Sequence, residues 1–513
     1  MLSKLYSASV YGIDGFLVTV EVDLSIGLPG INIVGLPDAA VKESQHRVQA
    51  AIKNNGYPFP LRKITINLAP ADIKKEGAAF DLPIACGILS AFGVIKQINF
   101  ERFIIIGELA LDGLLRPVKG VLSISLMAKQ LGFSGIILPK ENAKEAAIVR
   151  ELSVFGFSHL NEVVNFLNGS LNWEETKVDI NEIFNIYSEY NIDFADVKGQ
   201  LHAKRALEIA AAGSHNVLMI GPPGAGKTML ARRLVTILPK MELEEALETT
   251  KIHSVAGLLP PNQSLIATRP FRAPHHSISE AGLIGGGAVP KPGEVSLAHN
   301  GVLFLDELPE FHRDVLESLR QPLEDGFITI GRSKMTVSYP ARFMLVAAMN
   351  PCPCGYFGDL HKNCTCPITA VKKYRQKASG PLLDRIDIHI EVPSLKFEEL
   401  SSKEAGENSQ EIRERVEKAK KIQLERFKGL KKRKPIFANS QMDHKDIKKF
   451  CEISEKSQNL IKLAMEKFGL SARAYDRILK VARTIADLEG EEKIKENHIA
   501  EAIQYRSFDK IIF

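Results

Sequence analysis

The 513-residue sequence predicts an α/β protein whose central domain is a mainly parallel sheet with flanking helices. Two observations carry this prediction. Between residues 196 and 395, short apolar runs alternate with helical patterns, as repeated strand–helix units require. The first apolar run leads directly into a glycine-rich phosphate-binding motif at residues 221–228. A chain of this length is too long to fold around a single hydrophobic core, so two or three domains are expected.

The first predicted unit covers residues 1–165 and mixes helices with strands. Residues 64–68 alternate apolar and polar side chains, as a half-buried strand does. Residues 38–55 have a helical pattern with Asp38 in the N-cap position. We therefore expect an α+β fold here.

The remaining segments are a linker and a helical domain. Residues 166–195 are polar and acidic, which is typical of a linker. From 396 to 513 the chain is predicted to be all-α, an insert and a lid. A charged helix is expected at 410–427, and a basic stretch at 428–434 leads into a helical bundle.

Composition favours a globular protein of the cytoplasm. Hydrophobic residues make up 45% and charged residues 25% of the chain. It has no run of eighteen apolar residues and no apolar segment typical of a secretory signal, so we expect no membrane partner. The net charge of +5 permits an anionic partner such as nucleic acid but does not require one.

The glycine-rich motif predicts a site for ATP and Mg²⁺. It fits the P-loop pattern G-x-x-x-x-G-K-[ST] and consists of Gly221, Pro222, Pro223, Gly224, Ala225, Gly226, Lys227 and Thr228. Glycines allow backbone N–H groups to surround phosphate oxygens at the start of a helix. Lys227 is expected to reach the β- and γ-phosphates, and Thr228 to bind Mg²⁺. A chance glycine-rich turn is the alternative, but apolar and helical patterns flank this motif.

Polar residues at the ends of two later strands extend the predicted site. Asp306 and Glu307 follow an apolar run; Asp306 would hold Mg²⁺, and Glu307 would orient and deprotonate the attacking water. Asn350 follows the run 343–349 and would help to position that water. The alternatives are an ordinary acidic loop for the pair and a strand-end turn for Asn350.

Two arginines are candidates for contacts with the γ-phosphate. Arg385 lies in a turn and would act as a finger, or else form a structural salt bridge. Arg473 opens a helix of the C-terminal bundle. It would sense the γ-phosphate when the bundle closes, or else lie on a solvated helix face.

Four of the six cysteines lie within fifteen residues and suggest a zinc site. They are Cys352, Cys354, Cys364 and Cys366. Four thiolates suit tetrahedral Zn²⁺, although the two C-x-C pairs are tighter than the common C-x-x-C. Four free cysteines, a redox switch, or replacement of one thiolate by His361 are the alternatives. Cys86 and Cys451 are expected to be packing residues.

A β-hairpin at residues 327–338 is the first candidate for DNA contact. Its two arms alternate, and residues 331–334 are predicted to form the turn. Arg332 and Lys334 would grip phosphates there without reading sequence. A solvated basic turn is the alternative.

Two other segments are weaker candidates for DNA contact. In a ring, the hairpin would point into the pore, and residues 269–276 would form a second pore loop. Alternatively, His275 and His276 are simply loop residues, which we favour over metal binding. The basic stretch 428–434 is more often a solvated linker than a nucleic-acid site.

Several motifs resemble those of one family. Residues 269–276 and 285–299, running into the Asp306–Glu307 strand, resemble the signature of magnesium-chelatase-like AAA+ ATPases. More narrowly, residues 27–37 and 67–72 also fit the ComM/YifB group. The resemblance covers nearly the whole chain.

The resemblance implies a ring-forming motor, expected to be a homohexamer. It implies that Asn350 is sensor 1, Arg385 the finger acting on a neighbour's ATP, and Arg473 sensor 2. ComM-like proteins are implicated in natural transformation as helicases that drive branch migration of DNA.

The N-terminal unit resembles the Lon protease fold, whose members use a Ser–Lys dyad. Matching Lys75-Glu76-Gly77 to the family's serine loop aligns Ala79 with the nucleophile, and Leu122 aligns with the lysine. Lys119 is near but out of register. Without a hydroxyl no nucleophile is available, so we expect no peptidase activity.

Three functions are compatible with these features. The first is a hexameric motor on single-stranded or branched DNA. The second is the motor subunit of a metal chelatase, which is not expected to carry a Lon-like domain or a four-cysteine loop. The third is a non-proteolytic unfoldase. ATPase rates with forked DNA, porphyrin or unfolded protein would separate them.

Overall fold

The structure, a computed structural model, divides into two units that are described separately. It describes residues 1–96, 102–170, 173–187, 190–260, 263–287, 290–332, 335–359, 362–378, 380–394, 406–430 and 436–506. Unit 1 comprises Met1–Tyr187 and Leu243–Ala267, and unit 2 comprises Ser188–Glu242 and Thr268–Phe513.

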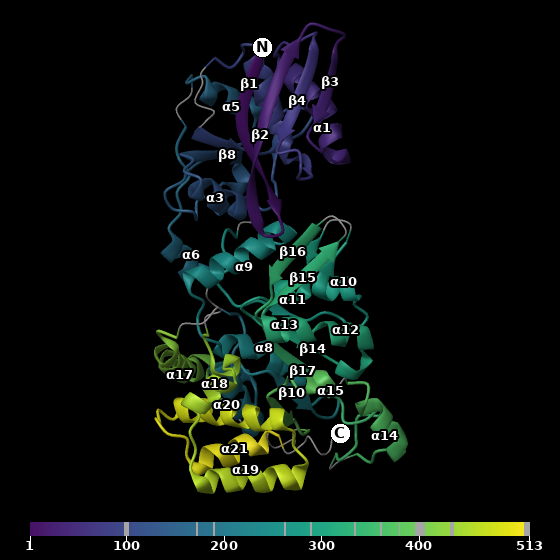
Figure 1. Ribbon diagram of the computed structural model, residues 1–513, viewed down its shortest axis with the longest axis vertical. Helices are drawn as coiled ribbons and strands as arrows, with labels where there is room; N and C mark the ends of the chain where they lie inside the picture. The colour runs from purple at the N-terminus through teal and green to yellow at the C-terminus, as the bar shows by residue number, and fades with distance from the viewer. Residues whose placement is uncertain are drawn as a thin grey trace. The chain divides into compact units, whose positions relative to one another are not determined.

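Unit 1 is built on a mixed seven-stranded sheet in the order β3-β4-β2-β1-β5-β8-β9 (Figure 1). Its strands are β1 (Leu2–Tyr11), β2 (Asp14–Ser25), β3 (Gly30–Val34), β4 (Lys63–Ala69), β5 (Phe103–Ile105), β6 (Glu108–Leu109), β7 (Leu115–Arg116), β8 (Gly135–Pro139) and β9 (Ser153–Phe157). Its helices are α1 (Ala39–Asn54), α2 (Asp81–Ala91), α3 (Val121–Gln130), α4 (Ala143–Ala146), α5 (Leu160–Leu167), α6 (Ile180–Tyr187) and α9 (Leu243–Ala256).

The predicted elements of unit 1 form for the expected local reasons. The Asp38 carboxylate accepts the Val41 N–H at 2.7 Å and caps α1, which buries its apolar face against α2. Strand β4 alternates buried and half-exposed residues, as its sequence predicts. The segment predicted as a linker contains α6, and its Trp173 packs on Phe157 with ring centroids 4.7 Å apart.

Helix α9 belongs to unit 1 although it follows the P-loop helix in the sequence. It packs on α3, and Ser254 donates to the buried Glu145 carboxylate at 2.5 Å. Glu145 also accepts the Leu122 N–H at 2.9 Å. Burial raises the pKa of Glu145, and these hydrogen bonds oppose that effect. No sequence pattern indicated this docking.

Unit 2 contains the phosphate-binding motif and the helical C-terminus. Its strands are β10 (Val217–Ile220), β11 (Phe271–Arg272), β12 (Gly285–Gly286), β13 (Lys291–Pro292), β14 (Val302–Leu305), β15 (Phe327–Arg332), β16 (Met335–Pro340), β17 (Met344–Met349) and β18 (Ile388–Glu391). Its helices are α7 (Leu201–Gly213), α8 (Lys227–Ile237), α10 (Glu280–Ile284), α11 (Glu294–Leu297), α12 (Arg313–Ser318), α13 (Arg320–Asp325), α14 (Ile368–Arg375), α15 (Gly380–Leu383), α17 (Ser409–Phe427), α18 (His444–Phe450), α19 (Glu455–Phe468), α20 (Ala472–Leu488) and α21 (Glu496–Gln504).

The main sheet of unit 2 is parallel throughout, as the sequence predicts. Its order is β11-β14-β17-β10-β18, and every neighbouring pair is parallel. Strands β14 and β17 are buried along their whole length, which matches their uninterrupted apolar sequences. Because all strands run the same way, the loops that follow them leave from one edge of the sheet.

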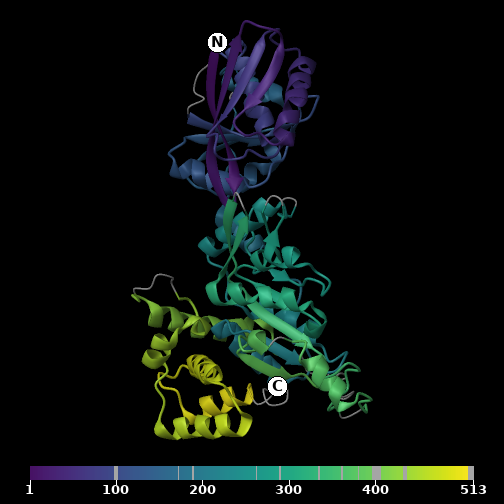
Figure 2. The same ribbon diagram turned by 45° about the vertical axis from the view of Figure 1, so that its right-hand side comes forward.

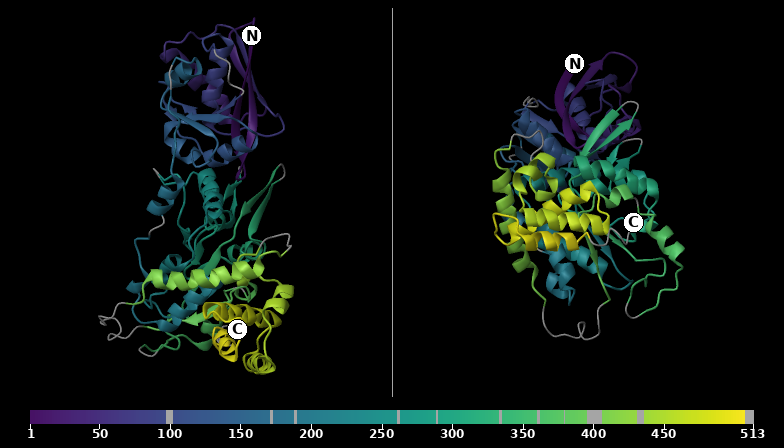
Figure 3. Two further views of the ribbon diagram at one scale, coloured as in Figure 1. Left: turned by 90° about the vertical axis from the view of Figure 1, so that its left-hand side faces the viewer. Right: turned by 60° about the horizontal axis from the view of Figure 1, so that its bottom comes forward.

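The C-terminal helices form a bundle beside this sheet. Figure 2 shows the yellow helices packed together, and the long helix α17 is clear in the left view of Figure 3. Helix α17 contacts α7, α8 and α20, so it joins the bundle to the helices of the sheet. The charged helix predicted at 410–427 is confirmed, because α17 spans Ser409–Phe427.

A buried polar cluster fastens the bundle to the sheet. His215 lies between Asp387 and Thr484, with Nδ1 3.1 Å from the Asp387 carboxylate and Nε2 2.8 Å from the Thr484 hydroxyl. Arg477 of α20 pairs with the same carboxylate. Burial alone would raise the pKa of Asp387, but Arg477 and His215 hold it well below its usual range.

The predicted hairpin is present, but its turn is shorter than expected. Strands β15 and β16 pair antiparallel, and Arg332 is opposite Met335. Gly331 and Arg332 are thus strand residues, and the prediction of a turn over 331–334 is wrong at its first two positions. A two-residue connection suits the twist of paired strands better than a longer turn. Lys334 lies outside the described residues.

Across the described ranges, no helix combines the length and hydropathy needed to span a bilayer.

Replacing Asp387 by Asn should destabilise unit 2 by about 3–5 kcal/mol, because Arg477 would lose its anion in a buried cluster. The urea midpoint should fall accordingly. Since the folded pKa lies below the unfolded value, the stabilisation is present above about pH 4 and lost as the pH falls through the folded pKa. Asp384→Asn, whose partner Arg473 is exposed, should cost no more than about 1 kcal/mol. Equal losses in the two variants would contradict this account.

Candidate functional site

The P-loop connects β10 to α8 at the carboxyl edge of the parallel sheet. Gly224 and Gly226 have φ values of 79° and 86°, a region that residues with a Cβ rarely adopt. The Gln200 side chain donates to the Ala225 carbonyl at 2.6 Å and braces the loop. Helix α8 begins at Lys227, so its free N–H groups face the loop, as an anion site requires.

Lys227 reaches across the loop to the end of the neighbouring strand. Its Nζ donates to the carbonyls of Gly221 at 2.7 Å and Pro222 at 2.9 Å, and to Oδ1 of Asn350 at 3.2 Å. Burial lowers the pKa of Lys227, and the carboxylates of Asp306 and Glu307 oppose this. The predicted phosphate ligand and the predicted sensor 1 residue are therefore in direct contact.

Thr228 and Asp306 are the second pair that the fold brings together. The Thr228 hydroxyl donates to the Asp306 carboxylate at 2.7 Å, although the two residues are 78 positions apart. Hydroxyl and carboxylate oxygens are the ligands that Mg²⁺ prefers. The donor set thus fits the predicted magnesium site, with Thr228 and Asp306 as the residues that would hold the ion.

Glu307 follows Asp306 at the mouth of a pocket of about 500 Å³. Asn350 lines the same pocket, together with Lys373, Tyr374 and Lys377 at or near the end of α14. Glu307 has a left-handed backbone with φ of 53°, and 55% of its side chain is exposed. A predicted base and a predicted water-positioning amide therefore face one cavity beside the P-loop.

Arg385 lies in the turn that contains Asp384, and Arg473 contacts that turn rather than the P-loop. Arg385 is buried, donates to the Pro381 carbonyl at 2.6 Å and pairs with Glu324. Arg473 is 66% exposed and lies 3.3 Å from the carboxylate of Asp384, the residue before Arg385. In the described part of the chain, both arginines bond to these groups rather than to P-loop residues.

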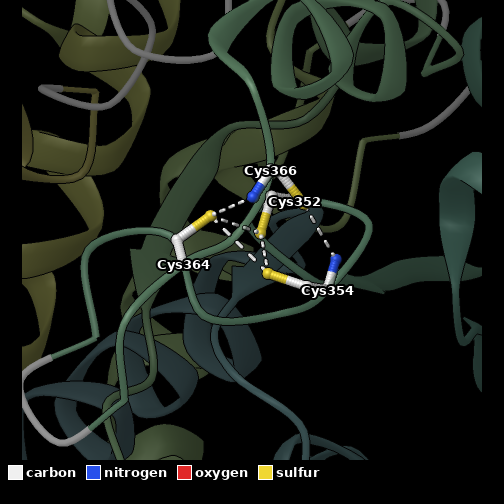
Figure 4. A group of neighbouring side chains, drawn as sticks. All are labelled: Cys352, Cys354, Cys364 and Cys366. Atoms are coloured by element: carbon white, nitrogen blue, oxygen red, sulfur yellow. Dashed lines mark hydrogen bonds between the residues drawn. The ribbon is translucent and has the colours of Figure 1, made fainter.

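The four cysteines converge on one point (Figure 4). Their Sγ atoms all lie within 4.8 Å of one another, and Cys352 is 3.3 Å from Cys354 and 3.6 Å from Cys364. Thiolates around one tetrahedral Zn²⁺ are about 3.8 Å apart, given Zn–S bonds of about 2.3 Å. Backbone N–H groups of Tyr356 and Thr365 lower the pKa of the Cys354 thiol to about 6. The set fits the predicted zinc site, whereas His361 lies outside the described residues.

The cysteine loop lies against the P-loop. Gly355 has φ of 88°, and a Cβ added there would come within 2.5 Å of the Pro223 ring. The loop begins directly after Asn350, and Arg375 of α14 donates to the Pro351 carbonyl at 3.0 Å. Any group that fixes this loop therefore also borders the phosphate site.

His276 is a site residue that the sequence reasoning treated as a loop residue. Its Nδ1 lies 3.3 Å from the Glu307 carboxylate, and its ring packs at a tilt against His275 with centroids 4.0 Å apart. No sequence signal was available, because the strand before His276 is only Phe271–Arg272 and is not an apolar run.

The candidate DNA contacts are only partly described. The backbone of Arg332 ends β15, but its side chain and all of Lys334 lie outside the described residues, as do residues 431–434 of the basic stretch 428–434.

Fold and site together define the class of protein. The P-loop strand β10 is separated from the acidic strand β14 by β17, which ends in the polar Asn350, and a helical bundle follows. This is the arrangement of AAA+ ATPases.

Comparison with known proteins agrees with this class. Family models match residues 193–400 as "Magnesium chelatase, subunit ChlI", 20–142 as "Subunit ChlI of Mg-chelatase" and 406–506 as "Magnesium chelatase, subunit ChlI C-terminal". The competence protein ComM of Haemophilus influenzae is 47% identical over 100% of this chain and 98% of its own length. The uncharacterized protein YifB of Escherichia coli is 43% identical with the same coverage. Lon protease 2 of Bacillus subtilis is 33% identical over 26% of this chain and 25% of its own length.

The chain therefore belongs to the magnesium-chelatase-like AAA+ ATPases, in the family of ComM and YifB.

The purified protein should carry one Zn²⁺ per chain, measured by inductively coupled plasma mass spectrometry. Cys354→Ser and Cys364→Ser should each lower the zinc content severalfold, because a structural site needs its four ligands. Cys451→Ser is the matched control, since Cys451 is buried outside the cluster. Full zinc content in the two cluster variants, or none in the wild type, would contradict the assignment.

Proposed function

We propose that this protein is an ATP-driven homohexameric motor that moves single-stranded or branched DNA, as in branch migration during natural transformation. The proposal of ATP hydrolysis rests on two contacts at one edge of the sheet, Lys227 with Asn350 and Thr228 with Asp306. The DNA part rests on the family, in which the relative from Haemophilus influenzae is named a competence protein.

Hydrolysis would use the residues of this edge in separate roles. Lys227 and the P-loop N–H groups bind the β- and γ-phosphates and orient them for in-line attack. Mg²⁺, held by Thr228 and Asp306, would neutralise charge on the phosphate oxygens. Glu307 accepts the proton of the attacking water, and Asn350 fixes that water's position. The pocket beside Glu307 and Asn350 supports these two assignments.

Arg385 would act as a finger on the ATP of a neighbouring subunit, and Arg473 would act as sensor 2, sensing the γ-phosphate when the bundle closes. Arg385 lies in the turn that contains Asp384, and Arg473 of α20 contacts the Asp384 carboxylate; among the described residues, their ion-pair partners are Glu324 and Asp384 rather than P-loop groups. A finger of this kind neutralises charge that develops in the transition state. Arg385 would first have to leave Glu324, which is itself well exposed.

DNA would be gripped at Arg332 and Lys334 through phosphate contacts that carry no sequence information. The observation in favour is a two-stranded hairpin that ends at these positions. Activity on DNA would take place in the cytoplasm.

Two other functions remain as candidates. Matches to chelatase subunit models favour the motor of a metal chelatase, whereas the identity to a competence protein over the full chain favours the DNA motor. A non-proteolytic unfoldase is the other. Ala79 offers no nucleophilic hydroxyl and Leu122 is buried and apolar, so we expect no peptidase activity.

Mixing two inactive variants tests whether Arg385 acts between subunits. Arg385→Ala should lower ATP turnover by about 10³-fold or more while ATP still binds, and Lys227→Ala should abolish turnover. In mixed rings, an intact ATP site of the first variant can face an intact finger of the second. Each interface of such a ring pairs the ATP site of one subunit with the finger of the next. In a random one-to-one mixture, about a quarter of the interfaces combine an intact site with an intact finger, so up to about a quarter of wild-type turnover should be recovered. Mixed rings detected by native mass spectrometry without recovered turnover would contradict action in trans.

Forked DNA should stimulate ATP turnover, and the wild type should displace a strand or migrate a junction while Lys227→Ala does not. Combined Arg332→Ala and Lys334→Ala should weaken DNA binding and flatten its salt dependence, because phosphate contacts release counterions. Basal ATP turnover should stay unchanged in that variant. If porphyrin or unfolded protein stimulated ATP turnover and DNA did not, the proposal of a DNA motor would be wrong, and the chelatase motor or the unfoldase would be favoured instead.

A further inference from the structure

The position of His276 follows from the register of two parallel strands. Strands β11 and β14 pair with Arg272 opposite Leu303. Four residues beyond Arg272 is His276, and four residues beyond Leu303 is Glu307. Because parallel strands leave a sheet at the same edge, equal spacing brings these two side chains to the same place.

The segment that carries His276 is fixed at both ends. Arg272 makes two hydrogen bonds to the Glu294 carboxylate, both at 2.6 Å. Beyond the histidines, the Ile278 N–H donates to the His275 carbonyl at 3.0 Å, and Ser279 caps α10. The His276 ring thus projects from a short, anchored loop rather than from a long free one.

The ring itself is held from two sides. It meets Phe311 edge-on with ring centroids 6.4 Å apart, and the His275 ring packs against it at a tilt of 35° with centroids 4.0 Å apart. Aromatic contacts of this kind restrict a ring to one orientation. In that orientation Nδ1 is 3.3 Å from Oε2 of Glu307.

Glu307 has few other restraints. Its backbone N–H donates to Asp306 at 3.0 Å, but its side chain is 55% exposed. Within the described ranges, the side chain that forms an ion pair with its carboxylate is His276. A flexible carboxylate samples several rotamers, and only those that face the attacking water are productive.

We propose that His276 is a positioning residue that holds the Glu307 carboxylate in the orientation needed for general-base catalysis. This inference rests on the proposed ATP hydrolysis at the P-loop. His276 acts through Glu307, so it changes the turnover number and leaves the binding of ATP unchanged.

The kinetic test compares variants of the full-length protein in steady-state ATP hydrolysis. His276→Ala should lower kcat by about 10- to 100-fold, the usual cost of losing alignment of a reacting group, with the Kd of a fluorescent ATP analogue unchanged. His276→Gln should recover part of kcat, since its amide N–H also donates. His275→Ala removes one ring packed against His276 but keeps the His276–Glu307 contact and the Phe311 contact, so it should lower kcat less than His276→Ala does.

A double variant separates positioning from general disruption. Glu307→Gln removes the base, so adding His276→Ala to it should lower kcat no further. An additional loss there, a raised Kd for the ATP analogue, a kcat unchanged by His276→Ala, or one raised by it would each overturn the proposal.

A second measurement detects the contact between His276 and Glu307 without measuring ATP turnover. The contact can therefore be tested even if the protein has no ATPase activity. In protein labelled with ¹⁵N-histidine, the His276 ring signals are assigned by their loss in His276→Gln. Glu307→Gln should shift these signals, whereas Glu310→Gln, which alters a carboxylate of the same pocket, should not. Equal or absent shifts in the two variants would overturn the contact, and failure of Lys227→Ala to lower wild-type turnover would overturn only the ATPase assignment.

Discussion

The parallel pairing of β10, β14 and β17 is the constraint on which the site depends. Strand β17 lies between the other two strands, with Met344 opposite Val302 and Val346 opposite Val217, and the carboxyl ends of all three strands leave one edge. Each loop at that edge contributes one part of the site. A slip of one residue in β14 would turn Asp306 away from Thr228, since successive side chains point to opposite faces of a sheet.

The helical bundle is joined to this edge by charge as well as by packing. Asp387 directly precedes β18, the strand next to the P-loop strand, and pairs with Arg477 on α20. His215 completes the same cluster just before β10. A movement of the bundle therefore acts on the strands on which the P-loop is built. Arg473, at the start of α20, contacts Asp384. Movement of the bundle therefore also alters the surface that carries Arg473 and Arg385.

The cysteine loop has a place in this arrangement that its sequence alone does not reveal. It leaves the sheet at Asn350, contacts Pro223 through Gly355, and continues into α14, whose Lys373 and Tyr374 line the pocket beside Glu307. A metal held by four thiolates would order a segment with little core of its own. Such order would act on two sides of the phosphate site, at Pro223 and at Asn350.

The sequence by itself determined the parts of this protein whose chemistry is local. The P-loop at 221–228, the acidic strand end at Asp306 and the cysteine cluster each need a fixed spacing within one short segment, and spacing is visible in a sequence. Only the tertiary structure decided which distant residues meet. The docking of α9 on unit 1, the pairing of Arg385 with Glu324 and the contact of His276 with Glu307 depend on strand order, register and packing. No local pattern encodes these contacts, because their energy comes from surfaces that exist only after the chain has folded.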